Sequence, residues 1–155
     1  MTRHLLLALA SAMALSHAAC DAEKATTKHE DSMKITLRVG DKTLTATLID
    51  CKTTRDFVSL LPLTLTMNDL FGREKFAHLP RAISTEGKRT HTSEVGNIAY
   101  WSPGPDVAIF YRNDGEKIPN PGLIIIGNID SGVEAFNVAG SVKVKIELTA
   151  QMPGK

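Results

Sequence analysis

The side chains with the strongest recognition chemistry in this sequence are aromatic, and four of them form two adjacent pairs. Tyr100 is followed by Trp101, and Phe110 is followed by Tyr111. Aromatic side chains offer a large apolar contact area, and Tyr and Trp add one polar atom, so they suit the recognition of a peptide or a small ligand. In the alternative interpretation, every second member of these pairs lies in the core and the others sit singly on the surface. We take Tyr100, Trp101 and Tyr111 as ligand-binding candidates.

Charged side chains could complete a binding site beside these aromatic residues. The charged residues that we expect near the rim of the fold are Glu74, Arg81, Glu86 and Asp130. Their spacing does not show whether they converge, and surface ion pairing is the ordinary role of such residues. Glu74, Arg81 and Asp130 are therefore further ligand-binding candidates.

The residues do not support hydrolytic catalysis. The nucleophile motif Gly-x-Ser-x-Gly is absent, and Asp130-Ser131-Gly132 is better explained as the start of a helix. His78 follows a strand pattern and has no obvious partner. Glu86 and Glu94 fall in a predicted loop, where nothing would hold two carboxylates at the fixed separation that a paired mechanism needs.

The two cysteines, Cys20 and Cys51, do not predict a metal site. Two thiols are too few, and His78 and His91 lack the ligand spacing that would complete a site with them. In an oxidising compartment Cys20 and Cys51 could form a disulfide, and otherwise Cys51 is a buried, unreactive side chain. Both interpretations are favoured over redox chemistry, and we predict neither a metal nor a cofactor.

Residues 1–20 have the layout of a secretory signal peptide. Arg3 and His4 make a basic start, residues 5–15 are apolar or small, and Ser16-His17-Ala18 resembles a cleavage site. The apolar run is shorter than the ~20 residues that span a bilayer, which argues against a membrane helix. We therefore expect an exported protein, either periplasmic or extracellular.

The end of this leader leaves two outcomes open. Ala18-Ala19-Cys20 also resembles the end of a bacterial lipoprotein signal, in which the cysteine becomes the lipidated first residue. His17 stands where that signal usually has leucine, which favours ordinary cleavage. Cys20 is thus a candidate for lipidation, and a lipid there is the one membrane contact that we predict.

The rest of the chain is a polar tether followed by one domain with balanced charge. Residues 21–33 have almost no large apolar side chains, residues 34–149 carry regular patterns, and residues 150–155 form a tail. The chain has 18 Lys and Arg against 17 Asp and Glu, and Arg3 is the only one of these in the leader. Without a basic run, the sequence predicts no nucleic-acid partner.

Strand patterns recur along the whole domain. Most follow a period of two, whereas residues 123–126 are continuously apolar, as in a strand that is covered on both faces. Asn68-Asp69 and Gly72 mark a turn, and residues 84–96 are predicted to form an exposed loop. The predicted strands cover residues 35–39, 44–48, 63–67, 75–79, 98–101, 107–111, 123–126 and 142–148.

Two short helices interrupt the strands. The stripe of apolar residues in 53–61 predicts a helix that starts with Thr53 or Thr54 as its N-cap and ends before Pro62. A second helix is expected from Asp130 or Ser131 to about residue 138. About eight strands are enough to close a barrel that its own side chains fill. The predicted fold class is therefore mostly β, a closed barrel with one or two short capping helices.

Several short motifs follow one another along residues 34–148. They are Thr54-Arg55-Asp56-Phe57, Leu60-Leu61-Pro62-Leu63-Thr64-Leu65, Glu74-Lys75, Leu79-Pro80-Arg81, Gly96-Asn97-Ile98-Ala99-Tyr100, Ala108-Ile109-Phe110-Tyr111 and Gly127-Asn128-Ile129-Asp130-Ser131-Gly132. Their order resembles that of a bacterial family described as cyclophilin-like proteins, which diverge from true cyclophilins. This resemblance implies a cyclophilin-like β-barrel. Where the family has an asparagine after Asp50, this chain has Cys51.

The resemblance also raises peptidyl-prolyl isomerase activity as an alternative function. True cyclophilins use an arginine beside an apolar pocket, together with a glutamine, and this chain lacks a Phe-His-Arg run and has its one glutamine, Gln151, in the tail. Arg38, Arg55, Arg81 and Arg112 are available, although surface ion pairing suits each of them. Fold alone does not confer function. We therefore expect non-catalytic binding of a peptide or small ligand, with a divergent isomerase as the alternative.

Overall fold

Nine β-strands, one α-helix and one 3-10 helix make up residues 32–149, the part of the chain that the computed structural model describes. The predicted signal peptide, Cys20, most of the predicted tether and the C-terminal tail lie outside the described residues. Neither of the two described helices is long and apolar enough to cross a membrane. The elements are β1 (Lys34–Val39), β2 (Lys42–Leu48), α1 (Lys52–Val58), β3 (Leu63–Leu70), β4 (Glu74–His78), β5 (Arg89–Thr90), β6 (Asn97–Trp101), β7 (Asp106–Phe110), β8 (Leu123–Ile129), η1 (Val133–Phe136) and β9 (Val142–Leu148).

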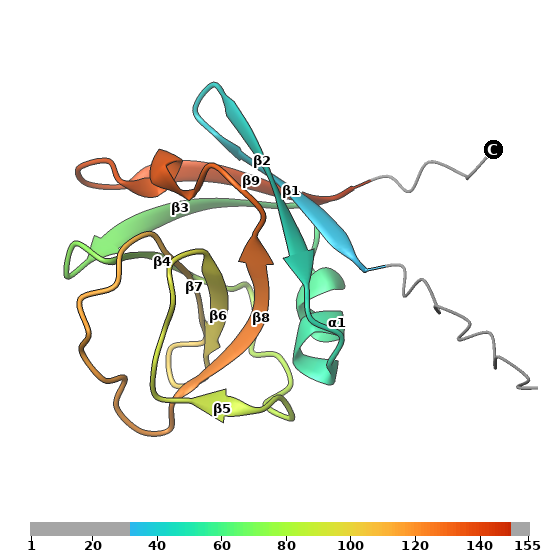
Figure 1. Ribbon diagram of the computed structural model, residues 1–155. Helices are drawn as coiled ribbons and strands as arrows, with labels where there is room; N and C mark the ends of the chain where they lie inside the picture. Colours follow the sequence, from blue (N-terminus) through green and yellow to red (C-terminus); the bar gives the residue numbers. More distant parts are fainter. Residues whose placement is uncertain (1–31, 150–155) are drawn as a thin grey trace, which may run out of the picture. The chain divides into compact units, whose positions relative to one another are not determined.

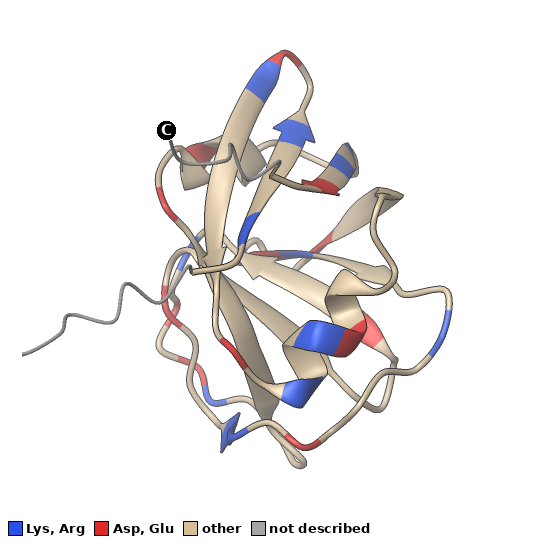
Figure 2. Ribbon diagram, turned by 90° about the vertical axis from the view of Figure 1, so that its right-hand side faces the viewer, with Lys and Arg blue, Asp and Glu red and all other residues tan. Residues whose placement is uncertain are grey.

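The strands form one antiparallel sheet that closes into a barrel (Figure 1). The strand order is β2-β1-β9-β3-β4-β7-β6-β8, and β2 pairs again with β8, so eight strands complete the circle. The short strand β5 adds to β8. The predicted closed barrel of about eight strands is confirmed. Charged residues of both signs are interspersed along the ribbon in a second view, without a large block of one sign (Figure 2).

The barrel closes where β8 meets β2, and a glycine makes the close approach possible. Gly127 of β8 is paired with Leu48 of β2. A side chain at Gly127 would place its Cβ 2.7 Å from Leu48 Cδ2 and 2.8 Å from the carbonyl oxygen of Thr47. Because the backbone of β2 has no room to move away, a residue without a side chain is needed at this position.

Side chains from all eight barrel strands fill the interior, as the alternation in the sequence predicts. The helix α1 adds Phe57 to this core, and η1 adds Phe136; both aromatic rings are fully buried. Burying a side chain of this size stabilises the fold by about 1.5–3 kcal/mol. Met33, which precedes β1, also packs against the core.

The start of α1 differs from the prediction. Cys51, not Thr53 or Thr54, is the N-cap residue, and it makes no side-chain capping hydrogen bond. Both threonines are buried instead, and Thr54 donates a hydrogen bond to the carbonyl oxygen of Ile126 in β8 at 3.3 Å. Burial of both threonines in the tertiary structure outweighs the local preference for a capping threonine.

Three adjacent strands are buried on both faces. Strands β6, β7 and β8 send alternate side chains into the core and to the outside of the barrel. The outer side chains form a second apolar cluster with Ile118, which comes from the segment between β7 and β8. The prediction of two-sided burial for residues 123–126 is confirmed, although Ile125 is only partly buried. The cluster consists of Ala99, Ala108, Phe110, Ile118 and Leu123, with Phe76, Trp101 and Ile125 packed against it.

The hairpin between β3 and β4 turns later than the sequence predicts. Asn68 and Asp69 belong to β3, and the turn is Leu70 to Arg73, closed by a hydrogen bond from Arg73 N to Leu70 O at 3.2 Å. Phe71 and Gly72, the central residues, have φ values of 56° and 65°. Positive φ at both positions suits Asn-Gly far better than Phe-Gly, so Phe71 carries backbone strain.

The second predicted helix is shorter than expected and is not capped by Asp130 or Ser131. It is a single 3-10 turn, η1, whose N-cap is Gly132 with φ of 83°. The Asp130 carboxylate accepts hydrogen bonds from Thr45, Thr47 and Lys34 instead, at 2.7–3.0 Å. The Asp130 side chain, which local preference would make the N-cap of the helix, is instead bound to side chains of β1 and β2.

The predicted loop of residues 84–96 contains the strand β5. Arg89 and Thr90 pair with Ile124 and Leu123 of β8. A strand of two polar residues is too short to produce a periodic pattern, so the sequence gives no signal for it.

A polar cluster that the sequence does not indicate lies at the inner face of the β3–β4 hairpin. Lys75 is fully buried, and its ammonium group donates hydrogen bonds to Asp69 Oδ2 at 2.8 Å and to the carbonyl oxygens of Val138 and Gly140, both at 2.6 Å. The Tyr111 hydroxyl donates to the same Asp69 oxygen at 2.5 Å. All three ammonium protons have acceptors, which offsets the cost of burying the charge.

Candidate functional site

A hollow on the outer wall of the barrel is the strongest candidate for a functional site. It encloses about 220 Å³ and is framed by the β3–β4 hairpin, β6, β7 and the segment before β8. We call it the outer-wall pocket. Its lining residues are Leu70, Phe71, Arg73, Glu74, Phe76, Trp101, Asp106, Ala108, Ile118, Pro119 and Leu123.

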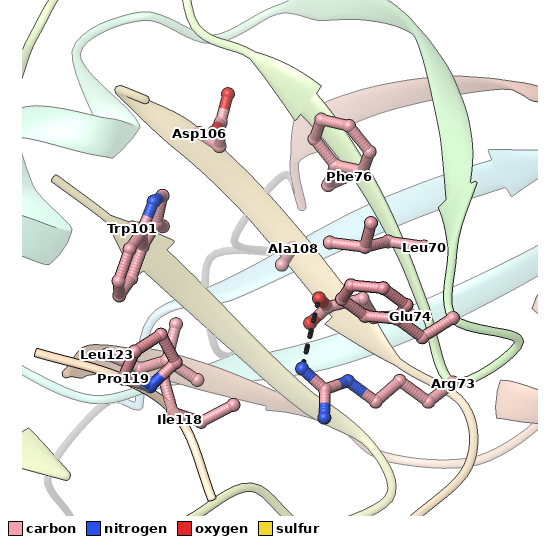
Figure 3. A pocket seen from close by; sticks show the side chains of 11 residues that line it. Leu70, Arg73, Glu74, Phe76, Trp101, Asp106, Ala108, Ile118, Pro119 and Leu123 are labelled. Carbon is pink, nitrogen blue, oxygen red and sulfur yellow. Dashed lines mark ion pairs between the residues drawn. The ribbon is translucent and has the colours of Figure 1, made fainter. Parts of the chain in front are cut away.

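The outer-wall pocket exists because the middle strands carry small residues on their outer faces. Ala108 of β7 is paired with Phe76 of β4 on one side and with Ala99 of β6 on the other. Ala108 therefore forms a low floor, while Phe76 and Trp101 stand on opposite sides of it (Figure 3). Aromatic walls around an alanine floor produce a slot for an apolar group.

The segment between β7 and β8 supplies the remaining wall and is held in place by His91. Ile118 N donates to the carbonyl oxygen of His91 at 2.9 Å, and His91 Nδ1 lies 2.9 Å from the carbonyl oxygen of Ile118. Ile118 is buried, whereas its neighbours in the segment are exposed. The buried Ile118 side chain and the two hydrogen bonds to His91 together hold Ile118 and Pro119 against the pocket.

Two buried charges stand at one corner of the outer-wall pocket (Figure 3). The side chains of Arg73 and Glu74 are only 9% and 7% exposed, and Arg73 Nη2 lies 3.8 Å from Glu74 Oε1. Arg73 Nη1 donates to Asp114 at 3.3 Å, and the guanidinium carbon lies 5.3 Å from the centre of the Phe71 ring. Among the described residues, Arg73 Nε has no hydrogen-bond partner.

Burial raises the pKa of the Glu74 carboxyl to about 7. The positive charge of Arg73 acts in the opposite direction, and the negative charges of Asp114, Asp106 and Asp69 add to the upward shift. The desolvation of the carboxylate outweighs the attraction of Arg73 because their charged atoms are 3.8 Å apart, too far for a hydrogen bond. Glu74 therefore gains or loses a proton close to neutral pH.

A histidine and an aspartate meet at the opposite rim. His78 Nδ1 contacts Asp106 Oδ1 and lies 3.1 Å from the carbonyl oxygen of Gly104. His78, which has no obvious partner in the sequence, thus has one in the fold. The residues that line the pocket include no Ser, Thr or Cys, so this pair has no neighbouring nucleophile among them.

Of the six ligand-binding candidates from the sequence, the outer-wall pocket brings together Glu74 and Trp101. Tyr100 points into the barrel, where it is 1% exposed and its hydroxyl oxygen accepts a hydrogen bond from Ile83 N at 3.3 Å. Tyr111 is held by Asp69 in the inner polar cluster. Alternation along β6 sends Tyr100 and Trp101 to opposite faces, as the alternative interpretation states.

The two other charged candidates lie away from the pocket lining. Arg81 is exposed and donates a hydrogen bond to the Ser59 hydroxyl at 2.9 Å. Asp130 is held by the first hairpin, with Lys34 Nζ 2.9 Å from its carboxylate. Neither residue contributes to the outer-wall pocket.

Sequence reasoning misses Arg73, Phe76 and Asp106. The arginines singled out in the sequence do not include Arg73, the one arginine that lines the pocket. Phe76 could have been found, because β4 pairs with β7 and Phe76 lies opposite Ala108 on the outer face. Nothing in the sequence pointed to Arg73, because the predicted turn begins at Asn68 whereas the observed turn runs from Leu70 to Arg73.

Other groups with chemical potential lie outside the outer-wall pocket. Cys51 is half-buried, with its sulfur 3.2 Å from Thr54 Oγ1. A disulfide to Cys20, one of the two interpretations that the sequence left open, falls partly outside the described residues. Within residues 32–149, no three His, Cys, Asp or Glu side chains cluster so as to hold a metal ion. An open depression across β1, β3 and β9 is lined by Arg38, Gly40, Thr64, Lys143 and Lys145.

Comparisons with known proteins agree on the fold. The model of a family described as the cyclophilin-like family matches residues 37–147. A hypothetical protein from Archaeoglobus fulgidus, whose structure was determined in solution, superposes with a TM-score of 0.60 at 22% sequence identity, over 76% of this chain and 95% of that one. At this identity the likeness concerns the fold alone. A comparison with curated proteins finds no match.

The raised pKa of Glu74 predicts that stability falls as the pH rises from 4.5 to above 7. The native state favours the protonated carboxyl, so it binds more protons than the unfolded state across this window. The free energy of unfolding of the wild type, relative to that of Glu74→Gln, should therefore fall on the order of 2 to 3 kcal/mol between pH 4.5 and pH 8, as measured by urea denaturation.

The matched control is Glu94→Gln, because Glu94 is exposed and lies outside the pocket lining. The difference in the free energy of unfolding between Glu94→Gln and the wild type should not change over the same pH range. A flat difference for Glu74→Gln as well would show that burial does not raise the pKa of Glu74.

Proposed function

Because the chain belongs to the cyclophilin-like family and carries an apolar slot between two aromatic walls, we propose that it is a non-catalytic binding domain. The outer-wall pocket takes one apolar or aromatic group of a peptide or small ligand. The observation that carries this proposal is the alanine floor at Ala108 between Phe76 and Trp101.

The size and the lining of the pocket support this kind of ligand. About 220 Å³ is below the ~300–1,000 Å³ of sites that enclose a drug-sized molecule, so it suits a single side chain or a similar fragment. Most of the lining is apolar, with Arg73, Glu74 and Asp106 as the polar groups that would fix an orientation. A few charges on an apolar slot are typical of a specific binding site.

We further place this binding outside the cytoplasm, on the strength of the predicted signal peptide in residues 1–20. Mass spectrometry of the protein from the producing cell tests this placement. A mature chain that begins just after the leader, or at a lipidated Cys20, is expected. A full-length chain that retains Met1 would contradict export.

The binding proposal predicts that neutral aromatic fragments quench or shift the fluorescence of Trp101. Trp101 is the single tryptophan of the chain, so its emission reports directly on the pocket wall. Indole-free fragments such as N-acetyl-phenylalanine amide are suitable probes. Ala108→Leu should weaken their affinity at least about tenfold, because three added carbons fill the floor of the slot.

Ala82→Leu is the matched control, since Ala82 is exposed and lies outside the pocket lining. Its affinity for the fragments should equal that of the wild type, and circular dichroism should show both variants folded. Equal affinity in Ala108→Leu, or no response of Trp101 to any fragment, would contradict the proposed site.

A peptidyl-prolyl isomerase with a divergent active site is the second candidate function. The observation in its favour is Arg73, a guanidinium group beside an apolar pocket, the combination that true cyclophilins use. Against it, Glu74 and Asp114 already pair with Arg73, and no glutamine lines the pocket. In a protease-coupled assay on an Ala-Pro peptide, we expect no acceleration at micromolar protein. An acceleration that Arg73→Ala abolishes would establish the isomerase instead.

A further inference from the structure

Arg73 leaves one edge of its guanidinium group without hydrogen bonds inside the outer-wall pocket. Its Nη1 donates to both carboxylate oxygens of Asp114, at 3.3 and 3.4 Å. Its Nε has no partner among residues 32–149, and its Nη2 faces Glu74 Oε1 at 3.8 Å, beyond hydrogen-bond distance. The Nε and Nη2 donors form the edge that binds planar carboxylates with two parallel hydrogen bonds.

This free edge is costly in the unliganded protein. The Arg73 side chain is 91% buried, as its exposed fraction of 9% shows, and a buried donor without an acceptor is destabilising. Native proteins satisfy most buried donors, and each exception calls for a physical explanation, of which a functional role is one. A ligand that supplies an acceptor to Nε and Nη2 would remove this penalty, so the edge is selective for a ligand with such a group.

We propose that the outer-wall pocket binds an apolar or aromatic group that carries a carboxylate, with the carboxylate on the Nε and Nη2 edge of Arg73. This inference rests on the proposed function and names the class of its ligand. Such a carboxylate occurs both in small hydrophobic acids and at the C-terminus of a peptide that ends in an apolar residue. The apolar body occupies the slot above Ala108, between Phe76 and Trp101.

Glu74 is the internal competitor for this edge. When ionised it faces Arg73 and repels a second carboxylate, and when protonated its hydroxyl can donate a hydrogen bond to the incoming acid. The charged groups around it are Arg73 on the same hairpin, Asp69 in β3, Asp106 in β7 and Asp114 in the segment after β7. Burial raises the pKa of Glu74 most and the three aspartates add to the shift, so the protonated, acid-binding form is accessible near neutral pH.

The same charges raise the opposite expectation, a cationic ligand. Two carboxylates, Glu74 and Asp106, line the pocket beside aromatic rings that attract cations. However, Asp106 is in contact with His78, and Glu74 is the group that burial keeps partly protonated. Arg73 Nε and Asp106 Oδ1 both lack a hydrogen-bond partner within residues 32–149. The Asp106 oxygen already has the His78 ring nitrogen against it, whereas Arg73 Nε adjoins a second donor without a hydrogen bond, Nη2, and this pair of donors favours the carboxylate.

The test compares three ligands with the same carbon skeleton, namely 3-phenylpropionate, 3-phenylpropionamide and 3-phenylpropylamine. Binding to the wild-type chain is measured by Trp101 fluorescence and calorimetry at pH 6. The acid should bind at least about tenfold more tightly than the amide, because a hydrogen bond between the charged guanidinium and a charged carboxylate is stronger than one to a neutral amide. Arg73→Gln should reduce the acid to the affinity of the amide, and Arg81→Gln, which changes an arginine outside the pocket, should not.

The proton of Glu74 gives a second readout. The acid should bind more weakly at pH 8 than at pH 6, since Glu74 ionises in this window while the ligand, with a pKa of roughly 4–5, stays ionised. In Glu74→Gln, affinity should be tight and independent of pH. Calorimetry in two buffers should detect proton uptake by the wild type alone. Where Arg73→Gln fails to fold, Arg73→Lys retains the charge but not the bidentate edge and should lose the preference for the acid.

The outcomes separate the ligand class from the site. An amide that binds as well as the acid, or an amine that binds best, overturns the carboxylate assignment and leaves the proposed pocket intact if Ala108→Leu still weakens binding. No binding of any of the three ligands overturns both. A peptide that ends in a free phenylalanine carboxylate, compared with its amidated form and with the small acid, shows which source of carboxylate the pocket prefers.

Discussion

Strands β6, β7 and β8 carry apolar side chains on both faces, so the fold must cover them from inside the barrel and from outside. The inner faces are covered by the core that all eight barrel strands fill. The outer faces depend on the segment between β7 and β8, which contributes Ile118 and is held to His91 by one backbone hydrogen bond and one hydrogen bond of the His91 ring. The cover is incomplete where the outer face carries Ala108, and the outer-wall pocket is the space that remains.

The β3–β4 hairpin brings opposite charges to opposite faces of the same sheet. Glu74 and Lys75 are consecutive and both buried, but Lys75 points inward and Glu74 outward. Lys75 has an acceptor for each ammonium proton, whereas Glu74 faces Arg73 without a hydrogen bond. The inner charge is therefore a satisfied part of the structure. In the outer pair, Arg73 and Glu74, the Arg73 Nε has no hydrogen-bond partner among the described residues. The strained backbone of Phe71 lies next to Arg73 in the same hairpin.

Membership of the cyclophilin-like family accounts for the barrel but not for the chemistry on its wall. The same fold can carry unrelated sites, so the residues of the outer-wall pocket have to be judged by their own geometry. That geometry combines a slot for one apolar group with an arginine edge that lacks an acceptor. The proposal of a binding domain rests on these two features.

The sequence by itself determined the strands of the barrel but not β5, because alternation in 35–39, 44–48, 63–67 and 142–148 and the apolar run in 123–126 are local patterns that burial of one or both faces requires. It also pointed to Trp101 and Glu74. Only the tertiary structure decided that Tyr100 faces the core, that Asp130 leaves its helix cap for the first hairpin, and that Arg73 is buried beside Glu74. The physical reason is that period-two patterns specify alternation but not which neighbours meet across strands, and those long-range contacts set the burial, the hydrogen bonds and the pKa values of the site.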